Sequence, residues 1–473
     1  MNRQQCSFAN SIFGSLKVMV LTVFLGTMIY AQNPVPQIVG PVNPQAVVPG
    51  GGSFTLSVYG ANFVSGAVVN WNGQPRSTTF VSAHELQGQI LASDVVTNTA
   101  GTISVTNPAP GGGKSSSYAQ IEVHAPTATI VSNQPVNYNF GWYGLYPADF
   151  NGDGKLDLLG PGPGGIDLRL GNGDGTFRFG SIAGRNYHFP FNIVYGDFNG
   201  DGKLDIAYVS GDSNNTGFGK QVIVMFGDGT GKFTLGPKLT SWVGFSWLAV
   251  GDFNGDGKLD LAAVQGRNVG VFLGNGDGSF KSLKSYPLLG PGFGDDIAAA
   301  DFNGDGKLDL LTLDQYGNSY VFLGRGDGTF SYPAQLVASY PLGCDTFLKI
   351  SDFNGDGKPD IAFCTAGQIG VLIGNGDATF QSPAFYPAGS SFEFATGDFN
   401  SDGKTDIVIS RNDDNQFLLL LGNGDGTFQT EQVISLPTQN INGEIAMAVG
   451  DFNADGLLDF VLDDFEAYIF TQQ

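Results

Sequence analysis

The 473-residue chain is poor in histidine, cysteine and positive charge, and each shortage excludes a class of protein. Three histidines and three cysteines leave little material for a zinc site or for thiol chemistry. Lysine and arginine total 22 against 44 aspartates and glutamates, which gives a net charge of −22. A balance of that sign excludes non-specific nucleic-acid binding, which needs cations along the phosphates, and favours divalent cations as partners.

Glycine and proline are abundant, with 71 and 23 residues. Hydrophobic residues make up 41% of the sequence, which is enough for a core, whereas charged residues make up only 14%. The composition therefore indicates a turn-rich folded protein without Glu- and Lys-rich helices. Its length exceeds that of one typical domain of about 100–200 residues.

Residues 1–31 are expected to be a signal peptide. Basic residues precede an apolar run, 18–30, that is too short to cross a bilayer, and Ala31 is a small residue suited to cleavage. An uncleaved anchor is the alternative. Export would make the protein secreted, periplasmic or cell-surface bound. In such an oxidising compartment the two remaining cysteines, Cys344 and Cys364, could form a disulfide, which the sequence leaves open.

One nine-residue phrase, DFNGDGKLD or a close variant, recurs seven times at a period of about 50 residues. Its copies begin at Asp149, Asp197, Asp252, Asp301, Asp352, Asp398 and Asp451. Each copy lies between short apolar runs, and in the first six repeats a second phrase, GNGDGTF or a variant, follows the third run, as at Gly171 and Gly422. These runs and their Asp-Gly turns predict four antiparallel strands per repeat.

Four strands per period of this length are typical of a propeller blade, so the sequence predicts an all-β fold with a seven-bladed β-propeller over residues 127–473. The seventh repeat ends after its third strand, and residues 127–137, before the first repeat, have the pattern of a strand without a loop of its own. We expect that stretch to complete the seventh blade and close the ring, which removes an open sheet edge. An open solenoid, the alternative, does not explain the missing strand.

Every copy of the phrase carries oxygen-bearing side chains at positions 1, 3, 5 and 9, in the order Asp, Asn, Asp, Asp. With the carbonyl at position 7, these are the hard oxygen ligands that calcium prefers, and the glycine at position 6 permits the sharp turn around an ion. We therefore expect about seven structural Ca²⁺ ions, one per repeat. The expected side-chain ligands are Asp149, Asn151, Asp153, Asp157, Asp197, Asn199, Asp201, Asp205, Asp252, Asn254, Asp256, Asp260, Asp301, Asn303, Asp305, Asp309, Asp352, Asn354, Asp356, Asp360, Asp398, Asn400, Asp402, Asp406, Asp451, Asn453, Asp455 and Asp459.

Two other interpretations explain the phrase less well. An EF-hand needs a glutamate at position 12 and helical flanks, and the sequence offers neither. A metal-free Asx turn would leave three carboxylates close together, where they repel one another. At about 1 mM calcium, a site with a dissociation constant of about 10⁻⁴ M contributes about 1.4 kcal/mol, so seven sites would act as structural staples and not as catalytic ions.

The phrases DFNGDGKLD and GNGDGTF resemble the FG-GAP or VCBS-type repeats, whose best-known relatives are the integrin α-subunit propellers. The resemblance covers roughly residues 127–473. It implies that the oxygens at positions 1, 3, 5, 7 and 9 bind calcium on one face of the propeller and that ligands bind on the other face. Ser401 and Ala454 in place of the loop glycine, and Leu457 in place of lysine, are mild departures.

Residues 33–124 lack the calcium phrase and contain short strand-like runs separated by glycine and proline. That pattern fits a small immunoglobulin-like β-sandwich that precedes the propeller. The order VNPQAVVPGGGSFTLSVYGANF, VVNWNG and ISVTNPAPGGG resembles the IPT/TIG family. The resemblance implies a spacer or an adhesive unit.

Other candidate sites have less support. The tripeptide RGD at Arg325 is a cell-adhesion sequence, but it occupies the place of the GNGD turn of other repeats. The histidines are scattered and none lies beside a repeated Ser or Cys, so we expect no nucleophile–base pair and no enzyme. Aromatic residues gather in the connections between repeats, where recurring Tyr-Pro pairs are expected to pack between blades. Trp142, Trp242 and Trp247 are not repeated and are candidates for exposed stacking surfaces, and the acidic candidates on the same face are Asp295, Asp296, Asp413 and Asp414.

The sequence therefore predicts an exported, calcium-stabilised propeller behind an immunoglobulin-like module. It would serve binding or adhesion, with an extracellular protein or glycan as partner and no transmembrane anchor after signal cleavage. A calcium-dependent, lectin-like carbohydrate binder is the first alternative and would need the tryptophans exposed. An extracellular polysaccharide-degrading enzyme is the second, and would need an acid–base pair on the face opposite the calcium loops.

Overall fold

The computed structural model describes the chain from residue 33 onward with internal gaps. The described residues are 33–38, 42, 46–47, 52–96, 101–115, 118–123, 130–132, 144–162, 165–184, 190–210, 219–290, 292–332, 334–339, 348–365, 367–389, 392–411, 416–435, 446–463 and 467–472. Within them the fold is all-β, with one short 3₁₀ helix, η1 (Ala92–Asp94), and no α-helix. None of the helical structure in these ranges is long and apolar enough to cross a membrane. The predicted signal peptide, residues 1–31, lies outside the described residues.

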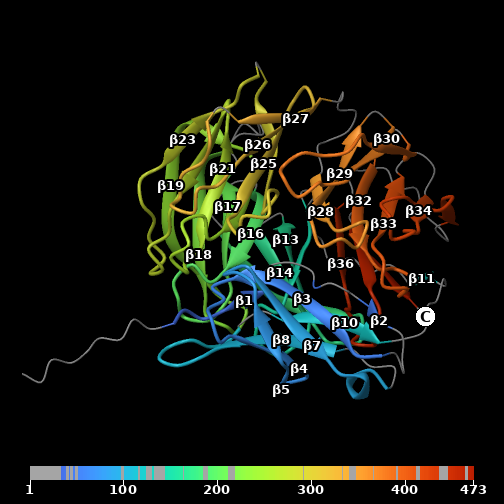
Figure 1. Ribbon diagram of the computed structural model, residues 1–473. Helices are drawn as coiled ribbons and strands as arrows, with labels where there is room; N and C mark the ends of the chain where they lie inside the picture. Colours follow the sequence, from blue (N-terminus) through green and yellow to red (C-terminus); the bar gives the residue numbers. More distant parts are fainter. Residues whose placement is uncertain are drawn as a thin grey trace, which may run out of the picture.

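The N-terminal part consists of two β-sheets that enclose a common apolar core. One sheet has the order β1 (Gln37–Ile38), β3 (Phe54–Ala61), β7 (Glu85–Ile90), β6 (Thr78–Phe80). The other has the order β2 (Ala46–Val47), β10 (Ala119–Val123), β8 (Gly101–Asn107), β4 (Val68–Trp71), β5 (Gln74–Pro75), with β9 (Gly113–Lys114) also paired to β8. Alternate residues of facing strands, such as Val58, Leu86 and Val105, meet in the core, as the period-two pattern of a half-buried strand requires. We call this part the N-terminal sandwich (Figure 1).

The remaining strands form four-stranded antiparallel sheets (Figure 1). We number the sheets 1 to 7 in the chain order of the nine-residue phrase that each contains. Sheets 1 to 3 are β12 (Tyr146–Ala148), β13 (Asp157–Gly162), β14 (Gly165–Gly171), β15 (Phe177–Ala183); β16 (Pro190–Gly196), β17 (Asp205–Ser210), β18 (Gly219–Gly227), β19 (Phe233–Phe245); and β20 (Leu248–Gly251), β21 (Asp260–Gln265), β22 (Asn268–Phe272), β23 (Lys284–Pro287). Sheets 4 and 5 are β24 (Gly294–Ala300), β25 (Asp309–Asp314), β26 (Asn318–Phe322), β27 (Gln335–Ser339); and β28 (Leu348–Ser351), β29 (Asp360–Thr365), β30 (Gln368–Leu372), β31 (Ala384–Pro387). Sheets 6 and 7 are β32 (Phe392–Gly397), β33 (Asp406–Arg411), β34 (Gln416–Leu420), β35 (Gln432–Ser435); and β36 (Ala446–Gly450), β37 (Asp459–Asp463), β38 (Ala467–Gln472), β11 (Ile130–Ser132).

The second strand of each sheet is the most deeply buried element. All six residues of β21 are buried, and the same holds for β17, β25 and β29. These strands are covered on both faces because apolar side chains of neighbouring sheets fill the space between them, as Val264 and Phe322 do between sheets 3 and 4. Burial on both faces explains why the strands are nearly continuous apolar runs without alternation.

Neighbouring sheets are joined by a contact that recurs around the assembly. The phenylalanine at position 2 of one loop packs edge-on against the phenylalanine of the GNGDGTF-type turn in the next sheet, as Phe253 does against Phe330 with ring centroids 5.6 Å apart. The carbonyl of Phe253 also accepts a 2.9 Å hydrogen bond from the N–H of Gly328. Such edge-to-face pairs stabilise by about 0.5–1.5 kcal/mol beyond the area they bury.

The last sheet contains a strand from the beginning of the assembly. β11, which comes from the stretch expected to supply the missing strand, pairs antiparallel with β38, with Ile130 opposite Gln472. Sheet 7 also packs on sheet 1, because Phe452 lies edge-on to Phe177 with centroids 5.5 Å apart. Repeated four-stranded antiparallel sheets that pack side by side in this way are consistent with a β-propeller.

Candidate metal centre

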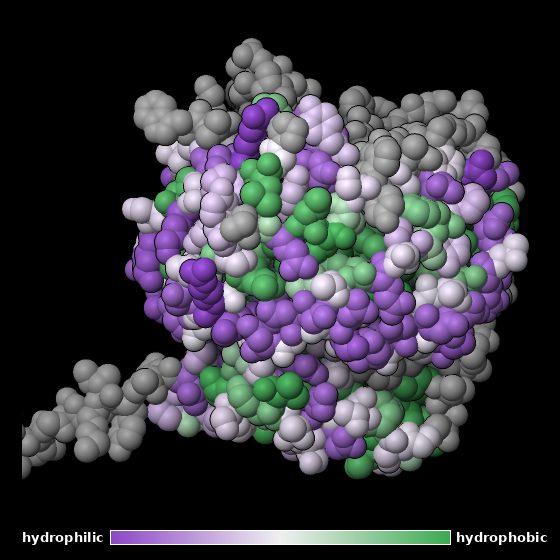
Figure 2. All heavy atoms as spheres, turned by 45° about the horizontal axis from the view of Figure 1, so that its top comes forward, coloured by the Kyte–Doolittle hydropathy of each residue, from purple (hydrophilic) through white to green (hydrophobic). Residues whose placement is uncertain are grey.

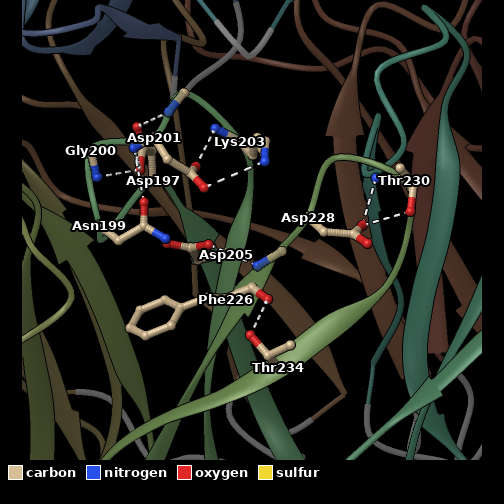
Figure 3. Close-up of polar contacts among 12 residues, drawn as sticks. Asp197, Asn199, Gly200, Asp201, Lys203, Asp205, Phe226, Asp228, Thr230 and Thr234 are labelled. Atoms are coloured by element: carbon tan, nitrogen blue, oxygen red, sulfur yellow. Dashed lines mark hydrogen bonds and ion pairs between the residues drawn. The ribbon is translucent and has the colours of Figure 1, made fainter.

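Each repeated nine-residue phrase forms a closed loop between the first and second strands of its sheet. We call these loops the metal loops and give each the number of its sheet. In loop 2 the carboxylate at position 1, Asp197, accepts N–H groups from three consecutive residues: Gly200 at 2.7 Å, Asp201 at 3.1 Å and Gly202 at 2.8 Å (Figure 3). The two glycines have φ of 78° and 81°, in the left-handed region that glycine adopts without strain. The local sequence therefore determines the turn, because one aspartate and two glycines wrap the backbone around a carboxylate.

The side chains at positions 3 and 5 continue the same pattern. The Oδ1 atom of Asn199 accepts the N–H of Asp201 at 2.8 Å, and Oδ1 of Asp201 accepts the N–H of Lys203 at 3.0 Å. The Lys203 ammonium lies 3.7 Å from Oδ2 of Asp201 (Figure 3). Both partners of this ion pair are exposed, so it contributes little to stability.

The aspartate at position 9 is the first residue of the second strand and is fully buried. Asp205 accepts the N–H of Phe198, at position 2 of its own loop, and the N–H of Gly227, at the end of the third strand, each at 2.9 Å. The carboxylate thus ties the loop to the sheet. In each of loops 1 to 6 the position-9 aspartate accepts the same two kinds of N–H group.

The buried carboxylates are held in surroundings that disfavour their charge. Burial raises the pKa of the position-9 aspartates of loops 1 to 5 to about 7 and raises the pKa of those of loops 6 and 7, Asp406 and Asp459, to about 8. The carboxylates at positions 1 and 5 raise the pKa of the position-9 carboxyl further, because like charges lie close together. Three mutually repelling carboxylates per loop are therefore gathered in one place.

The donor set fits calcium. Each loop gathers three carboxylates and one amide oxygen, all hard oxygen donors, and their mutual repulsion would be relieved by a divalent cation. In loop 7 the Oδ1 atom of Asp459 is buried without a hydrogen-bond partner, which leaves an acceptor available to a cation. In the ranges that the structure describes, no group of three His, Cys, Asp or Glu side chains is placed so that it could hold a metal ion, and in loop 2 backbone N–H groups donate to both carboxylate oxygens of Asp197.

Two loops depart from glycine at position 4, as the sequence indicated. Ser401 and Ala454 each have φ of 58°, so non-glycine residues occupy the left-handed conformation that glycine adopts in the other loops. The loop geometry is kept at both sites. The N–H groups of Asp402 and Gly403 still donate to Asp398, and the residues at the same two positions of loop 7 donate to Asp451. The two residues therefore strain the backbone, but the loop oxygens keep the arrangement that they have in the other loops.

The second phrase forms a tight Asx turn on the same side of each of sheets 1 to 6. In sheet 4, Oδ1 of Asp327 accepts the N–H and the hydroxyl of Thr329, and the N–H of Arg325 donates to the carbonyl of Thr329 at 2.9 Å. The RGD tripeptide at Arg325 therefore has the turn conformation of its counterparts. In sheet 1 the loop lysine links the two phrases, because Nζ of Lys155 donates to the carbonyl of Asn172 at 2.6 Å.

Some of the aromatic, cysteine and acidic candidates named from the sequence lie within the described residues, and others lie outside them. Trp247, a candidate for an exposed stacking surface, is half-buried against the apolar core between sheets 3 and 4. Tyr286 and Tyr386 pack edge-on against Phe330 and Phe428 of the next sheet, which confirms packing for these Tyr-Pro pairs. Cys364 is buried and disulfide-bonded. Outside the described residues or side chains lie Trp142, Trp242, Cys344, Asp295, Asp413, Asp414, His124 and His188.

A set of polar side chains lies on the first strands of the sheets, and the sequence indicated only Asp296 among them, as an acidic candidate, while Asn192 and Glu393 were missed. Oδ1 of Asn192 accepts the N–H of Leu248 in the next sheet at 2.6 Å, and Oδ2 of Asp296 accepts the N–H of Leu348 in the next sheet at 3.0 Å. Glu393 accepts the backbone N–H of Met447, in sheet 7, in the same way. These side chains lie five residues before position 1 of their loops, but they differ in type, so only the spacing could have identified them.

The antiparallel order of the strands places the hairpins between second and third strands opposite the metal loops. At that end, the side chain of Phe293 is 43% exposed, and the guanidinium of Arg267 stacks over its ring at 5.5 Å. Tyr316 of the neighbouring hairpin is 54% exposed, and the N–H of Gln315 beside it donates to the carbonyl of Phe293 at 2.9 Å. Leu289 is also half exposed, and we call these four side chains, Arg267, Leu289, Phe293 and Tyr316, the hairpin patch. In the view with this end brought forward, apolar side chains gather near the middle of the sheet assembly above a hydrophilic band (Figure 2).

Comparison with known proteins identifies the repeats. The model of the FG-GAP-like repeat matches residues 149–208, 197–263, 252–312, 301–346, 352–409 and 398–462. No curated protein matches the chain.

Among solved structures, an Agrocybe aegerita lectin that recognises non-reducing terminal N-acetylglucosamine is similar, with 20% identity, a TM-score of 0.46 and coverage of 84% of this chain and 99% of the lectin. An auxiliary nutrient binding protein of Bacteroides ovatus is 11% identical, with a TM-score of 0.40 and coverage of 94% and 99%. A rhamnogalacturonan lyase of Bacillus licheniformis is 13% identical, with a TM-score of 0.43 and coverage of 93% and 91%. No TM-score in this group reaches 0.5, so none of these likenesses is evidence for a function.

Proposed function

Because the chain belongs to the FG-GAP-like repeat family, we propose that it is a calcium-stabilised, seven-bladed propeller that acts as a binding or adhesion module. The observation that carries the proposal is the convergence of three carboxylates in each loop, with position-9 aspartates whose pKa is raised by burial to about 7 or 8. A divalent cation would remove that repulsion and stabilise the folded state by mass action. The protein is not an enzyme under this proposal, and calcium serves the fold.

The seven-bladed ring is the architecture that best explains the contacts at the ends of the assembly. Sheets 7 and 1 share an apolar cluster that contains Leu158, Phe177, Phe452 and Val461, and β11 completes sheet 7. A ring closed in this way would hold the metal loops together on one face. Binding of the ions would then stabilise every blade, at about 1.4 kcal/mol for each site at about 1 mM calcium.

We propose the hairpin patch as part of the ligand-binding face, opposite the metal loops. Its exposed aromatic rings, with Arg267 stacked on Phe293, offer flat apolar surfaces of the kind that pack on sugar rings. These surfaces suit a glycan or a protein ligand, and the lectin-like alternative would depend on them and not on Trp247, which is half-buried. Export through the predicted signal peptide and an IPT/TIG-like identity for the N-terminal sandwich complete the proposal, with an extracellular glycan or protein as partner.

Thermal unfolding tests the calcium part of the proposal. The mature chain is expected to unfold at a far lower temperature in excess chelator than in about 1 mM calcium, because mass action stabilises only the folded state. A glycan array probed in calcium tests the binding part, with the double variant Phe293→Ala/Tyr316→Ala as the matched control. An unchanged unfolding temperature contradicts the calcium assignment, and identical array profiles for the two proteins contradict the assignment of the hairpin patch.

A further inference from the structure

The N-terminal sandwich lies directly on the face of the sheet assembly that carries the metal loops (Figure 1). Gln37 of β1 is buried, and its Nε2 atom donates to the carbonyl of Asp197, the first residue of loop 2, at 3.4 Å. Ala61, at the end of β3, belongs to an apolar cluster that also contains Phe198 of loop 2 and Leu259 of loop 3. The contact surface on the sheets is thus made from the loops themselves.

Loop 3 is the loop against which the sandwich fits most closely. A Cβ atom placed on Gly257, at position 6 of that loop, would lie 3.0 Å from Cγ of Pro34 and 3.6 Å from Oδ1 of Asn62. The Oδ1 atom of Asn62 is buried without a hydrogen-bond partner, so this amide oxygen faces the loop without satisfying a donor there. At the same position of loop 1, a Cβ atom on Gly154 would have nothing within 4 Å.

Loops 4 and 5 lie at the margin of the same contact. Ser82 approaches Gly306 of loop 4, where an added Cβ would lie 3.9 Å from the Ser82 Cβ. Tyr59 of β3 is close enough to Asp352 of loop 5 to interact with its charge. The sandwich therefore covers one side of the loop face and leaves loop 1 open to solvent, where Gly152, Asp153 and Gly154 are exposed.

We propose that the N-terminal sandwich docks on loops 2 and 3 only when their carboxylates are held together by cations, so that calcium joins the two domains into one rigid body. This inference rests on the proposed function, because it requires that the loops bind calcium. Without a cation, repulsion among the three carboxylates favours a more open loop, which displaces the Asp197 carbonyl and the backbone of Gly257 from Gln37 and Pro34. The two domains are linked covalently, so docking is an intramolecular step that a modest coupling energy can control.

Docking of the sandwich has a consequence for ligand access. It occupies the metal-loop side of the assembly and so leaves the side of the hairpin patch for an external ligand. Calcium would then set the distance and angle between the sandwich and that ligand-binding side, as well as the stability of the propeller.

Fluorescence energy transfer between dyes on Gln74→Cys, in the sandwich, and Lys281→Cys, in sheet 3, measures docking in the mature chain. The matched pair of variants is Asp256→Asn in loop 3 and Asp153→Asn in loop 1, since both remove one position-5 carboxylate, but of these two loops loop 3 fits closely against the sandwich at position 6 and loop 1 does not. We expect the Asp256→Asn variant to need about tenfold more calcium for half-maximal transfer than the Asp153→Asn variant. Ala61→Arg should keep transfer low at every calcium concentration while the number of ions bound per chain stays that of the wild type.

Equal calcium dependence for the two aspartate variants would overturn the inference. So would full transfer in chelator at a temperature where circular dichroism shows both domains folded. The ion count, measured on the same samples, separates this failure from that of the proposed function. A wild-type chain that binds calcium but docks without it contradicts only the inference, whereas a chain that binds no calcium contradicts both.

Discussion

The N–H of Gly175, in sheet 1, donates a 3.0 Å hydrogen bond to the carbonyl of Phe452, in loop 7. The same bond joins consecutive sheets elsewhere, for example from Gly426 to Phe353 at 3.1 Å. The two ends of the repeat array are therefore joined by the contact that joins its neighbours. If the sheets form the closed ring that we propose, this contact leaves no weak seam between the first and last sheets.

That equivalence can be tested by shortening the corresponding phenylalanine side chain at two places in the repeat array. Phe452→Ala and Phe353→Ala each remove a fully buried phenylalanine at position 2 of a loop, and each should cost about 3–5 kcal/mol of unfolding free energy. If the ring is closed in solution, the two costs measured by denaturant unfolding in calcium will agree within about 1 kcal/mol. A much smaller cost for Phe452→Ala would mean that sheets 7 and 1 are separated. The pair Phe452→Leu and Phe353→Leu gives the same comparison if an alanine variant does not fold.

Ala454→Gly is expected to stabilise the protein. Ala454 is exposed and has φ of 58° at a position that is glycine in five of the seven loops, so the substitution removes strain without removing a contact. The gain should be about 1 kcal/mol in unfolding free energy. The reverse change at the same position of loop 1, Gly152→Ala, should cost about as much. A loss of stability in Ala454→Gly would show that the alanine has a role that its conformation does not explain.

Glu393 should make the protein less stable as the pH rises. Burial raises the pKa of its carboxyl from 4.5 to about 8, and its Oε2 atom is buried without a hydrogen-bond partner. Between these two pH values the folded state binds more protons than the unfolded state, so this group lowers stability as the pH increases toward 8, and the loss is complete above that pH. Each unit of the rise in pKa corresponds to about 1.4 kcal/mol.

Glu393→Gln should remove that dependence. In saturating calcium, which holds the loop carboxylates in one state, the variant is expected to be more stable than the wild type at pH 8 and similar to it near pH 4.5. The control is Glu431→Gln, an exposed site, which should leave the pH profile of the unfolding temperature unchanged. A wild-type profile and a Glu393→Gln profile that run parallel would contradict the assignment of a neutral carboxyl at this position.

The sequence was sufficient for the repeats, the all-β class and the residues of each loop, because these depend on local patterns. A loop closed by Asp197 and the glycines at positions 4 and 6 is determined within nine residues, and the family match confirms the repeats. The position-9 aspartates were predicted to be calcium ligands, but their hydrogen bonds to the end of the third strand were not predicted, since Asp205 and Gly227 are 22 residues apart.

Contacts between distant segments could not be predicted. Gln37 and Asp197 are 160 residues apart and neither belongs to a periodic pattern that would indicate their contact. The first-strand acceptors Asn192, Asp296 and Glu393 share a position but not a residue type, so no motif marked them as a set, and only Asp296 was named from the sequence. Trp247 was a candidate for exposure because it is not repeated, but it lies half-buried against the apolar core between sheets 3 and 4.

The central claim is that each loop holds a calcium ion, and the number of ions bound by the folded chain tests it most directly. Equilibrium dialysis of the mature protein against about 1 mM calcium, followed by elemental analysis, should give about seven ions per chain. Asp153→Asn, which weakens loop 1 alone, should lower the number by about one. A count of zero or one for the wild type, or a count that the Asp153→Asn variant leaves unchanged, would contradict the account.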